Sequence, residues 1–186
     1  MAGDVKARMV DGAVRLLATR GLQGTSFSEV LELTGAPRGS VYHHFPEGKD
    51  QLVGLAVDRA GQNALALVDS WAGSDAEQVT RNFLAVWREL LVRSHLTAGC
   101  SVLAVTVATD SPDLLGHAAE VFRAWRSHLA ALLAQAGIEP AIAGRFAALL
   151  VASSEGAVVM SRAEQSLDPF ELVAEQLIAQ AAALPA

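Results

Sequence analysis

Residues 25–52 read TSFSEVLELTGAPRGSVYHHFPEGKDQL, and this stretch decides the fold of the N-terminal part of the chain. Ser26 and Glu29 stand three residues apart, which is the spacing of a capping box at the start of a helix. Gly35 ends that helix, because glycine readily adopts the left-handed conformation at a helix C-terminus. Pro37 then permits only a tight turn, since proline fixes its own φ angle and disfavours helix in the residue before it. The stretch therefore begins with a short helix and a turn.

A second short helix is predicted over residues 38–45, and Pro46-Glu47-Gly48 ends it. The two short helices follow a longer helix that ends at Arg20-Gly21, with the glycine as its C-cap. Two helices joined by a glycine-containing turn are typical of a helix-turn-helix, in which the second helix enters the major groove of DNA. We therefore expect a three-helix DNA-binding domain over residues 1–50, with the helix-turn-helix at about residues 26–45.

The two faces of the second helix differ in chemistry. At 100° per residue, Val41 and Phe45 point together toward the core. The opposite arc and its flanks suit a DNA groove, because glycine lets the backbone approach while hydroxyl, imidazole and guanidinium groups bind phosphates or base edges. These residues are Arg38, Gly39, Ser40, Tyr42, His43 and His44. Any one of them could equally be an ordinary packed or solvated residue, but the turn, the helix face and the flanking cations together favour DNA.

Three further residues near the helix-turn-helix are candidates for phosphate contacts. Thr25 and Ser26 stand at the N-terminus of the preceding helix, where free N–H groups and the helix dipole attract phosphate. Lys49 opens the following helix and is expected to contact a phosphate. The net charge of the chain is −6, but residues 1–50 hold six basic and six acidic groups, so the remaining 8 basic and 14 acidic groups lie in residues 51–186. A neutral N-terminal part and an acidic body permit a local DNA-facing patch without predicting one.

The rest of the chain also has helical spacing nearly everywhere, and the body from 51 to 186 is expected to form a second, helical domain. The stretch 102–108 is rich in β-branched residues and could form a strand; it is assigned to a helix because no partner strand is evident. A capping box is expected at Ser74 and Glu77, and prolines just inside helix starts at Pro112 and Pro140. The predicted fold is all-α, with about nine helices.

Composition and motifs exclude several classes of protein. The single Cys100 allows no intramolecular disulfide and no multi-cysteine zinc site, and it is expected to be a buried small side chain. No apolar run is long enough for a membrane span, and the charged N-terminus has no signal core, which favours a cytoplasmic protein. The five histidines form no metal-ligand spacing, and no nucleophile or phosphate-loop motif is present. We expect no enzyme activity, no cofactor, no metal and no membrane partner.

The motif string resembles the N-terminal DNA-binding domain of the TetR family of transcriptional repressors. The resemblance covers residues 4–55 and rests on the Gly35 turn, the block Ser40-Val41-Tyr42-His43-His44-Phe45, and the Lys49 and Leu52 that follow. It implies base or phosphate contacts for Arg38, Gly39, Ser40 and His43, and phosphate contacts for Thr25, Tyr42, His44 and Lys49. Two features depart from the family pattern: Pro37 replaces the usual serine or threonine cap, and one extra residue precedes Lys49.

Short motifs in the body are similar to the LmrA/YxaF-like subgroup of that family. They are Gly99-Cys100, Glu155-Gly156-Ala157 and Arg162-Ala163-Glu164, together with the two departures above. The resemblance to ligand-sensing repressors implies a repressor that a small apolar or aromatic inducer releases from operator DNA. The alternatives are a constitutive repressor with a filled core, and a helical ligand-binding or interaction module without operator-specific DNA binding.

Two groups of residues in the body are candidates for these tasks. Aromatic side chains on three predicted helices could line a ligand pocket, although ordinary core packing explains any single one of them: Phe83, Trp87, Phe122, Trp125 and Phe146. Small and apolar residues on the last two helices could form a two-fold interface of a homodimer or pack within one chain: Ala148, Ala152, Gly156, Val173, Leu177 and Ile178. A dimer is favoured, because one helix-turn-helix buries too little surface for tight, specific binding.

Overall fold

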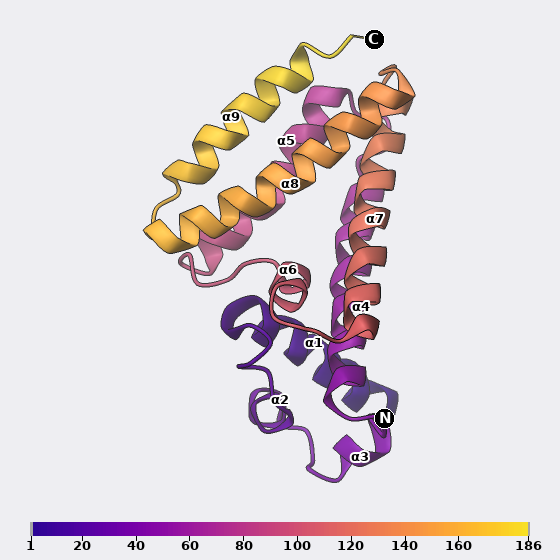
Figure 1. The fold of residues 1–186 in the computed structure, drawn as a ribbon, viewed down its shortest axis with the longest axis vertical. Coiled ribbons are helices and arrows are strands. Elements are labelled where there is room, and N and C mark those ends of the chain that lie inside the picture. Colours follow the sequence, from indigo (N-terminus) through magenta and orange to yellow (C-terminus); the bar gives the residue numbers. More distant parts are fainter. Residues whose placement is uncertain (1, 186) are drawn as a thin grey trace. The chain divides into compact units, whose positions relative to one another are not determined.

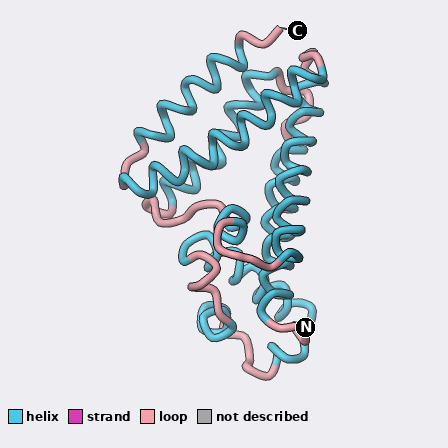
Figure 2. The backbone as a smooth tube through the Cα atoms, viewed as in Figure 1, coloured by secondary structure: helices cyan, strands magenta, loops and turns pink. Residues whose placement is uncertain are grey.

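The computed structural model describes residues 2–185, and within that range it contains helices and no strand (Figures 1 and 2). This confirms the predicted all-α fold. The helices are α1 (Ala2–Arg20), α2 (Phe27–Thr34), α3 (Ser40–His44), α4 (Lys49–Asp69), α5 (Ala76–Arg93), α6 (Ser101–Thr106), α7 (Pro112–Gln135), α8 (Pro140–Glu164) and α9 (Asp168–Ala182). Of the β-branched stretch 102–108, residues 102–106 belong to the helix α6, as expected, and residues 107–108 form a turn after it.

The chain divides into two compact units. Unit 1 consists of residues 1–63 and 100–121, and unit 2 consists of residues 64–99 and 122–186. The helices α4 and α7 each contribute residues to both units. Unit 1 therefore contains α6 and the first parts of these two long helices together with the N-terminal residues. The domain boundary expected at residue 50 lies at the end of the sequence motif, and it stays a prediction.

Unit 1 is built on α1, which packs against α2, α3 and α6. Gly12 on α1 is buried at the contact with α2, where a Cβ atom would lie 2.5 Å from the Cγ2 methyl group of Thr34. Phe45, directly after α3, is 2% exposed and belongs to the same core. The close approach of α1 and α2 therefore favours glycine at position 12.

Unit 2 is built from α5, α8 and α9, which pack pairwise. The helix α8 is long and apolar enough to cross a membrane by length and composition alone, but half of its most apolar stretch is buried in the protein. Toward its C-terminus, Arg162 Nη2 donates a hydrogen bond to the carbonyl oxygen of Thr97, at 2.9 Å. A Cβ atom on Gly99 would lie 2.8 Å from Arg162 Nη1, so the guanidinium group covers this glycine. Helix α8 thus packs on both α5 and α9 and also holds the chain that leaves α5.

Two local predictions need correction. The N-cap of α5 is Asp75, whose side chain accepts a hydrogen bond from Gln78 N, and not the predicted Ser74. The helix α3 begins at Ser40, two residues later than predicted, because the N–H group of Ser40 donates to Pro37 O at 3.0 Å and closes a turn over the intervening residues. Pro112 and Pro140 do begin helices, as predicted.

Candidate nucleic-acid interface

The turn between α2 and α3 is fixed by its glycine and by Ser40. Gly35 has φ = 64° and its N–H group donates to Leu31 O, which ends α2 as predicted. The hydroxyl group of Ser40 donates to Pro37 O at 2.5 Å and lies 3.6 Å from the sulfur of Met9 on α1. Ser40 therefore holds the start of α3 against α1, and its hydroxyl group is engaged within the protein in the absence of DNA.

The side chains of α3 separate into a buried face and an exposed arc. Val41 and Phe45 are 7% and 2% exposed, so the inward face is the predicted one. Tyr42 is 85% exposed, His43 is exposed, and the rings of His43 and His44 lie 4.8 Å apart between centroids. The exposed arc therefore presents the phenol of Tyr42 and the imidazole of His43 to solvent, while His44 beside them is half-buried.

Arg38 and Gly39 precede α3 and are both exposed. No hydrogen bond or ion pair of the Arg38 guanidinium is found within residues 2–185, so its five N–H groups are available to a ligand. The structure therefore places Arg38 and Gly39 at the N-terminal end of the same exposed arc.

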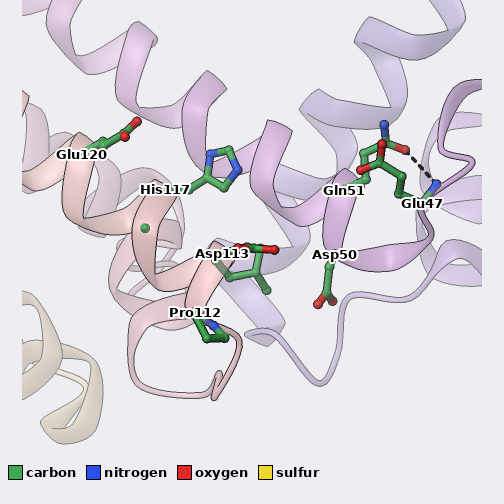
Figure 3. A pocket seen from close by; sticks show the side chains of 9 residues that line it. Glu47, Asp50, Gln51, Pro112, Asp113, His117 and Glu120 are labelled. Atoms are coloured by element: carbon green, nitrogen blue, oxygen red, sulfur yellow. Dashed lines mark hydrogen bonds between the residues drawn. The ribbon is translucent and has the colours of Figure 1, made fainter.

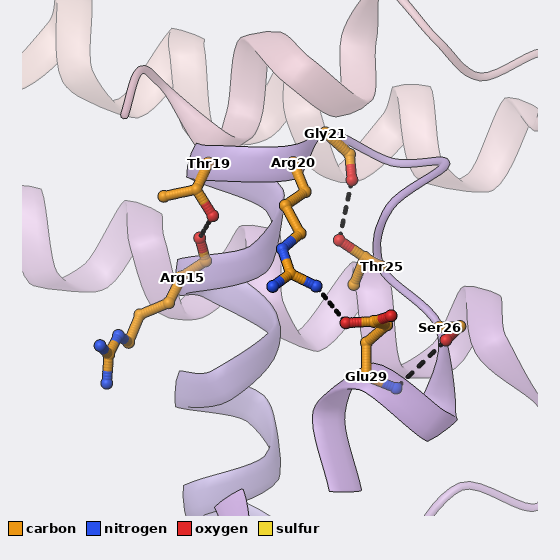
Figure 4. Close-up of polar contacts among 7 residues, drawn as sticks. All are labelled: Arg15, Thr19, Arg20, Gly21, Thr25, Ser26 and Glu29. Carbon is orange, nitrogen blue, oxygen red and sulfur yellow. Dashed lines mark hydrogen bonds and ion pairs between the residues drawn. The ribbon is translucent and has the colours of Figure 1, made fainter. Parts of the chain in front are cut away.

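The corner between α1 and α2 differs from the prediction (Figure 4). Thr25 is completely buried, and its hydroxyl group donates to Gly21 O at 2.8 Å. Contrary to the prediction, this side chain is therefore not accessible to a phosphate. Ser26 caps α2, since its hydroxyl oxygen accepts a hydrogen bond from Glu29 N at 3.2 Å. The Glu29 carboxylate forms an ion pair with Arg20. The capping box is therefore half formed, because the only side-chain partner described for Glu29 is the guanidinium of Arg20.

Lys49 opens α4 and is half-buried. Its Nζ atom donates a hydrogen bond to Leu22 O at 2.9 Å. This contact ties the start of α4 to the turn after α1. Lys49 therefore helps to hold the turn after α1 in place. Its predicted contact with a phosphate remains a proposal.

A second surface of unit 1 is acidic (Figure 3). A groove of about 610 Å³ lies between the start of α4 and the start of α7, and Glu47, Asp50, Asp113, Glu120 and His117 are among the residues that line it. His117 is paired through Nδ1 with Asp58, at 2.8 Å. No group of three or more potential metal ligands is found among the described residues. Four carboxylates would repel DNA phosphates, so the chemistry of this groove does not suit DNA binding.

The predicted ligand-binding aromatics all lie in unit 2. Phe83 and Trp87 are 7% and 9% exposed, and their rings lie 6.5 Å apart. Trp125 is 4% exposed and its ring lies 5.6 Å from that of the half-buried Phe122. Phe146 is buried on α8. Such ring contacts occur both in an ordinary core and in the wall of a closed ligand pocket. They do not distinguish the two, so the ligand role of these residues remains a proposal.

The predicted dimer residues are not all available to a partner chain. On α8, Ala152 and Gly156 are exposed and Ala148 is half-buried. On α9, Val173 and Ile178 are half-buried, whereas Leu177 is 3% exposed and belongs to the core of unit 2, contrary to the prediction. Exposed apolar side chains that the sequence analysis did not select lie on the same two helices: Leu149, Val159, Met160 and Leu172. The outer surface of α8 and α9 is thus more apolar than predicted.

Both the N-terminal and the C-terminal part of the chain are similar to known transcriptional regulators. Residues 9–56 match bacterial regulatory proteins of the tetR family, and residues 76–176 match the C-terminal domain of LmrA/YxaF-like transcriptional regulators. An uncharacterised HTH-type transcriptional regulator of Mycobacterium tuberculosis is 36% identical over 179 residues, which cover 92% of this chain and 91% of that protein.

Two more distant similarities agree with these matches. The uncharacterised HTH-type transcriptional regulator YxaF of Bacillus subtilis is 27% identical, with 94% of each chain covered. A crystal structure of a TetR transcriptional regulator from Chloroflexus aurantiacus has a TM-score of 0.79 and 27% identity, over 96% of this chain and 94% of that one. The chain therefore belongs to the TetR family of DNA-binding bacterial transcriptional regulators, and its C-terminal part to the LmrA/YxaF-like group.

Proposed function

We propose that this protein is a homodimeric repressor that binds operator DNA and leaves it when a small apolar or aromatic molecule binds in unit 2. The observation that carries the proposal is the exposed arc of α3 and the turn before it. Arg38, Gly39, Tyr42 and His43 are exposed there, while Val41 on the same helix is buried. In this proposal Arg38 and His43 contact base edges, and Tyr42, His44 and Lys49 contact phosphates.

The proposed dimer answers a geometric need of this arc. A single α3 has five residues and cannot bury enough surface for a tight, specific complex with DNA. Two copies related by a two-fold axis place their recognition helices about one turn of DNA apart, roughly 34–36 Å. The exposed apolar side chains on the outer surface of α8 and α9 support this surface as the interface, with Ala152 and Gly156 permitting close approach.

The proposed inducer site lies among the aromatic side chains of unit 2. Phe83, Trp87, Trp125 and Phe146 are buried and bear no charge, which suits a neutral or weakly charged ligand. By linkage, a ligand that weakens DNA affinity a hundredfold binds the DNA-bound protein a hundredfold less tightly, a coupling of about 2.7 kcal/mol. The proposed place of action is the cytoplasm, where the operator DNA lies.

Footprinting on the DNA around the gene of this protein tests the proposal. A repressor of this kind protects a palindromic site. The logarithm of its affinity for that site falls linearly with the logarithm of the salt concentration. Replacing Arg38 or His43 should change the preference among base pairs, whereas replacing Tyr42 or Lys49 should weaken all sites about equally. A protein that protects no palindromic fragment and sediments as a monomer at micromolar concentration contradicts the proposed function.

A further inference from the structure

Arg20 carries an exposed cation at the edge of the helix-turn-helix that neither the sequence motif nor the resemblance assigns. It is the last residue of α1, and its Nη1 group is paired with the Glu29 carboxylate in the first turn of α2 (Figure 4). The side chains of Arg20 and Glu29 are 57% and 39% exposed. The other N–H groups of this guanidinium have no partner within residues 2–185, so most of its donors face solvent.

The backbone that carries Arg20 is held in place. A Cβ atom on Gly24 would lie 2.5 Å from the Cβ atom of Arg20 and 2.7 Å from its carbonyl oxygen, so the turn after α1 closes directly on this residue. Thr25 ties the turn to Gly21, and Lys49 ties it to Leu22. Glu29 then fixes the far end of the side chain. Arg20 is therefore anchored at both ends.

Two residues that the motif assigns to phosphate at this corner make contacts within the protein, Thr25 through its only O–H group and Lys49 through one of its three N–H donors. Thr25 is buried and its hydroxyl group donates to Gly21 O. The Lys49 ammonium group donates to Leu22 O. Without Arg20, the Glu29 carboxylate would stand as an uncompensated negative charge where DNA phosphates are to approach. An exposed ion pair of this kind adds little to stability, so stabilisation of the fold is a weak explanation for it.

We propose that Arg20 binds a backbone phosphate of the DNA and that Glu29 holds its guanidinium group in position for that contact. The inference rests on the proposed function. A guanidinium group has five N–H donors in a planar fork that matches the oxygens of a phosphate, and the pair with Glu29 uses one edge of the fork and leaves the others. The contact is to the DNA backbone, so it contributes equally to every DNA sequence.

The test compares Arg20→Gln with the matched control Arg15→Gln, in the full-length protein. Arg15 is exposed on the same helix and loses the same charge, but its side chain points away from α2 (Figure 4). The probes are a labelled duplex from upstream of the gene of this protein and an unrelated duplex of equal length. Affinity is measured from 0.05 to 0.3 M NaCl, a range of roughly 0.8 log units in which counterion release dominates.

The expected result for Arg20→Gln is a smaller salt slope. Each lost phosphate contact lowers the slope by about 0.9, so a dimer loses about 1.8. When the two lines are extrapolated to a common affinity at 1 M salt, this slope change corresponds at 0.1 M salt to an affinity loss of roughly 60-fold on both duplexes. Arg20→Lys should restore most of the slope, because it restores the charge, while Arg15→Gln leaves the slope near that of the unmodified protein.

The outcomes that contradict this inference differ from those that contradict the proposed function. If the unmodified protein binds neither duplex in a salt-dependent manner, both fail. If it binds but Arg20→Gln keeps its slope, or Arg15→Gln loses as much slope as Arg20→Gln, the phosphate contact of Arg20 is refuted alone. A lower thermal midpoint of Arg20→Gln with an unchanged slope assigns the ion pair a purely structural role and also refutes it.

Discussion

Replacing Gly12 by alanine tests the close approach of α1 and α2, and two effects of opposite sign compete. Alanine favours a helix interior over glycine by about 0.8–1.0 kcal/mol. The new methyl group, however, would lie 2.5 Å from Thr34 Cγ2, and such overpacking of a core costs about 1–3 kcal/mol. Thr34 cannot rotate away freely, because its hydroxyl group donates to Val30 O at 2.7 Å. We therefore expect Gly12→Ala to lower the free energy of unfolding by about 1 kcal/mol.

Thr34→Ser supplies the matched background, since it deletes the clashing methyl group and keeps the hydroxyl group. In that background Gly12→Ala should stabilise the protein by up to about 1 kcal/mol, because the helix preference then acts alone. The coupling between the two substitutions is thus expected to be about 1–3 kcal/mol. Urea unfolding of the four proteins, followed by circular dichroism at one protein concentration, measures it. Equal effects of Gly12→Ala in both backgrounds would refute the reasoning.

Three further predictions concern other parts of the chain. Backbone hydrogen bonds from Ala141 and Ile142 hold the pKa of Glu139 below its ordinary value of 4.5, so this N-cap stabilises the protein at neutral pH and the stabilisation is lost as the pH falls through the lowered pKa. The thermal midpoints of Glu139→Gln and the unmodified protein should therefore differ at pH 7 and converge under acid conditions; a constant difference contradicts this. Ala152→Arg places a charge on the proposed dimer surface and should yield a folded monomer in sedimentation equilibrium, whereas an unchanged dimer would place the interface elsewhere. Trp87→Ala separates a sensor from a filled core: a sensor keeps operator binding in gel shifts and loses induction, while a core residue loses about 3–5 kcal/mol of stability and DNA binding with it.

The sequence predicted the helix end at which one residue type has a specific role, such as the glycine C-cap of α2. It did not predict which of two neighbouring residues caps α5. The glycine at position 35 adopts the left-handed conformation that ends α2, and Val41 and Phe45 point inward as the helical period requires. At the start of α5, Ser74 and Asp75 are both good N-caps one residue apart. In the structure Asp75 is the cap, because its carboxylate accepts the hydrogen bond from Gln78 N, and nothing in the sequence distinguishes the two candidates.

The candidate site shows the same division. Exposure of Tyr42 and His43 followed from the helix face, which depends on local geometry. Burial of Thr25 did not, because its hydroxyl group turns back to Gly21 O rather than outward. Arg20 was overlooked, although its place at the end of α1, nine residues before Glu29, was a signal that could have indicated a pair between the two helices.

The contact between Arg162 and Gly99 has a consequence for the evolution of this group of proteins. Two short motifs that are 63 positions apart in the sequence are parts of one contact, because the guanidinium group occupies the space that a side chain at position 99 would fill. The same arginine also donates to Thr97 O, so a shorter residue at position 162 would leave that carbonyl group without its donor. Neither position can change alone without loss, and we expect the two to vary together among relatives, as residues in direct contact do.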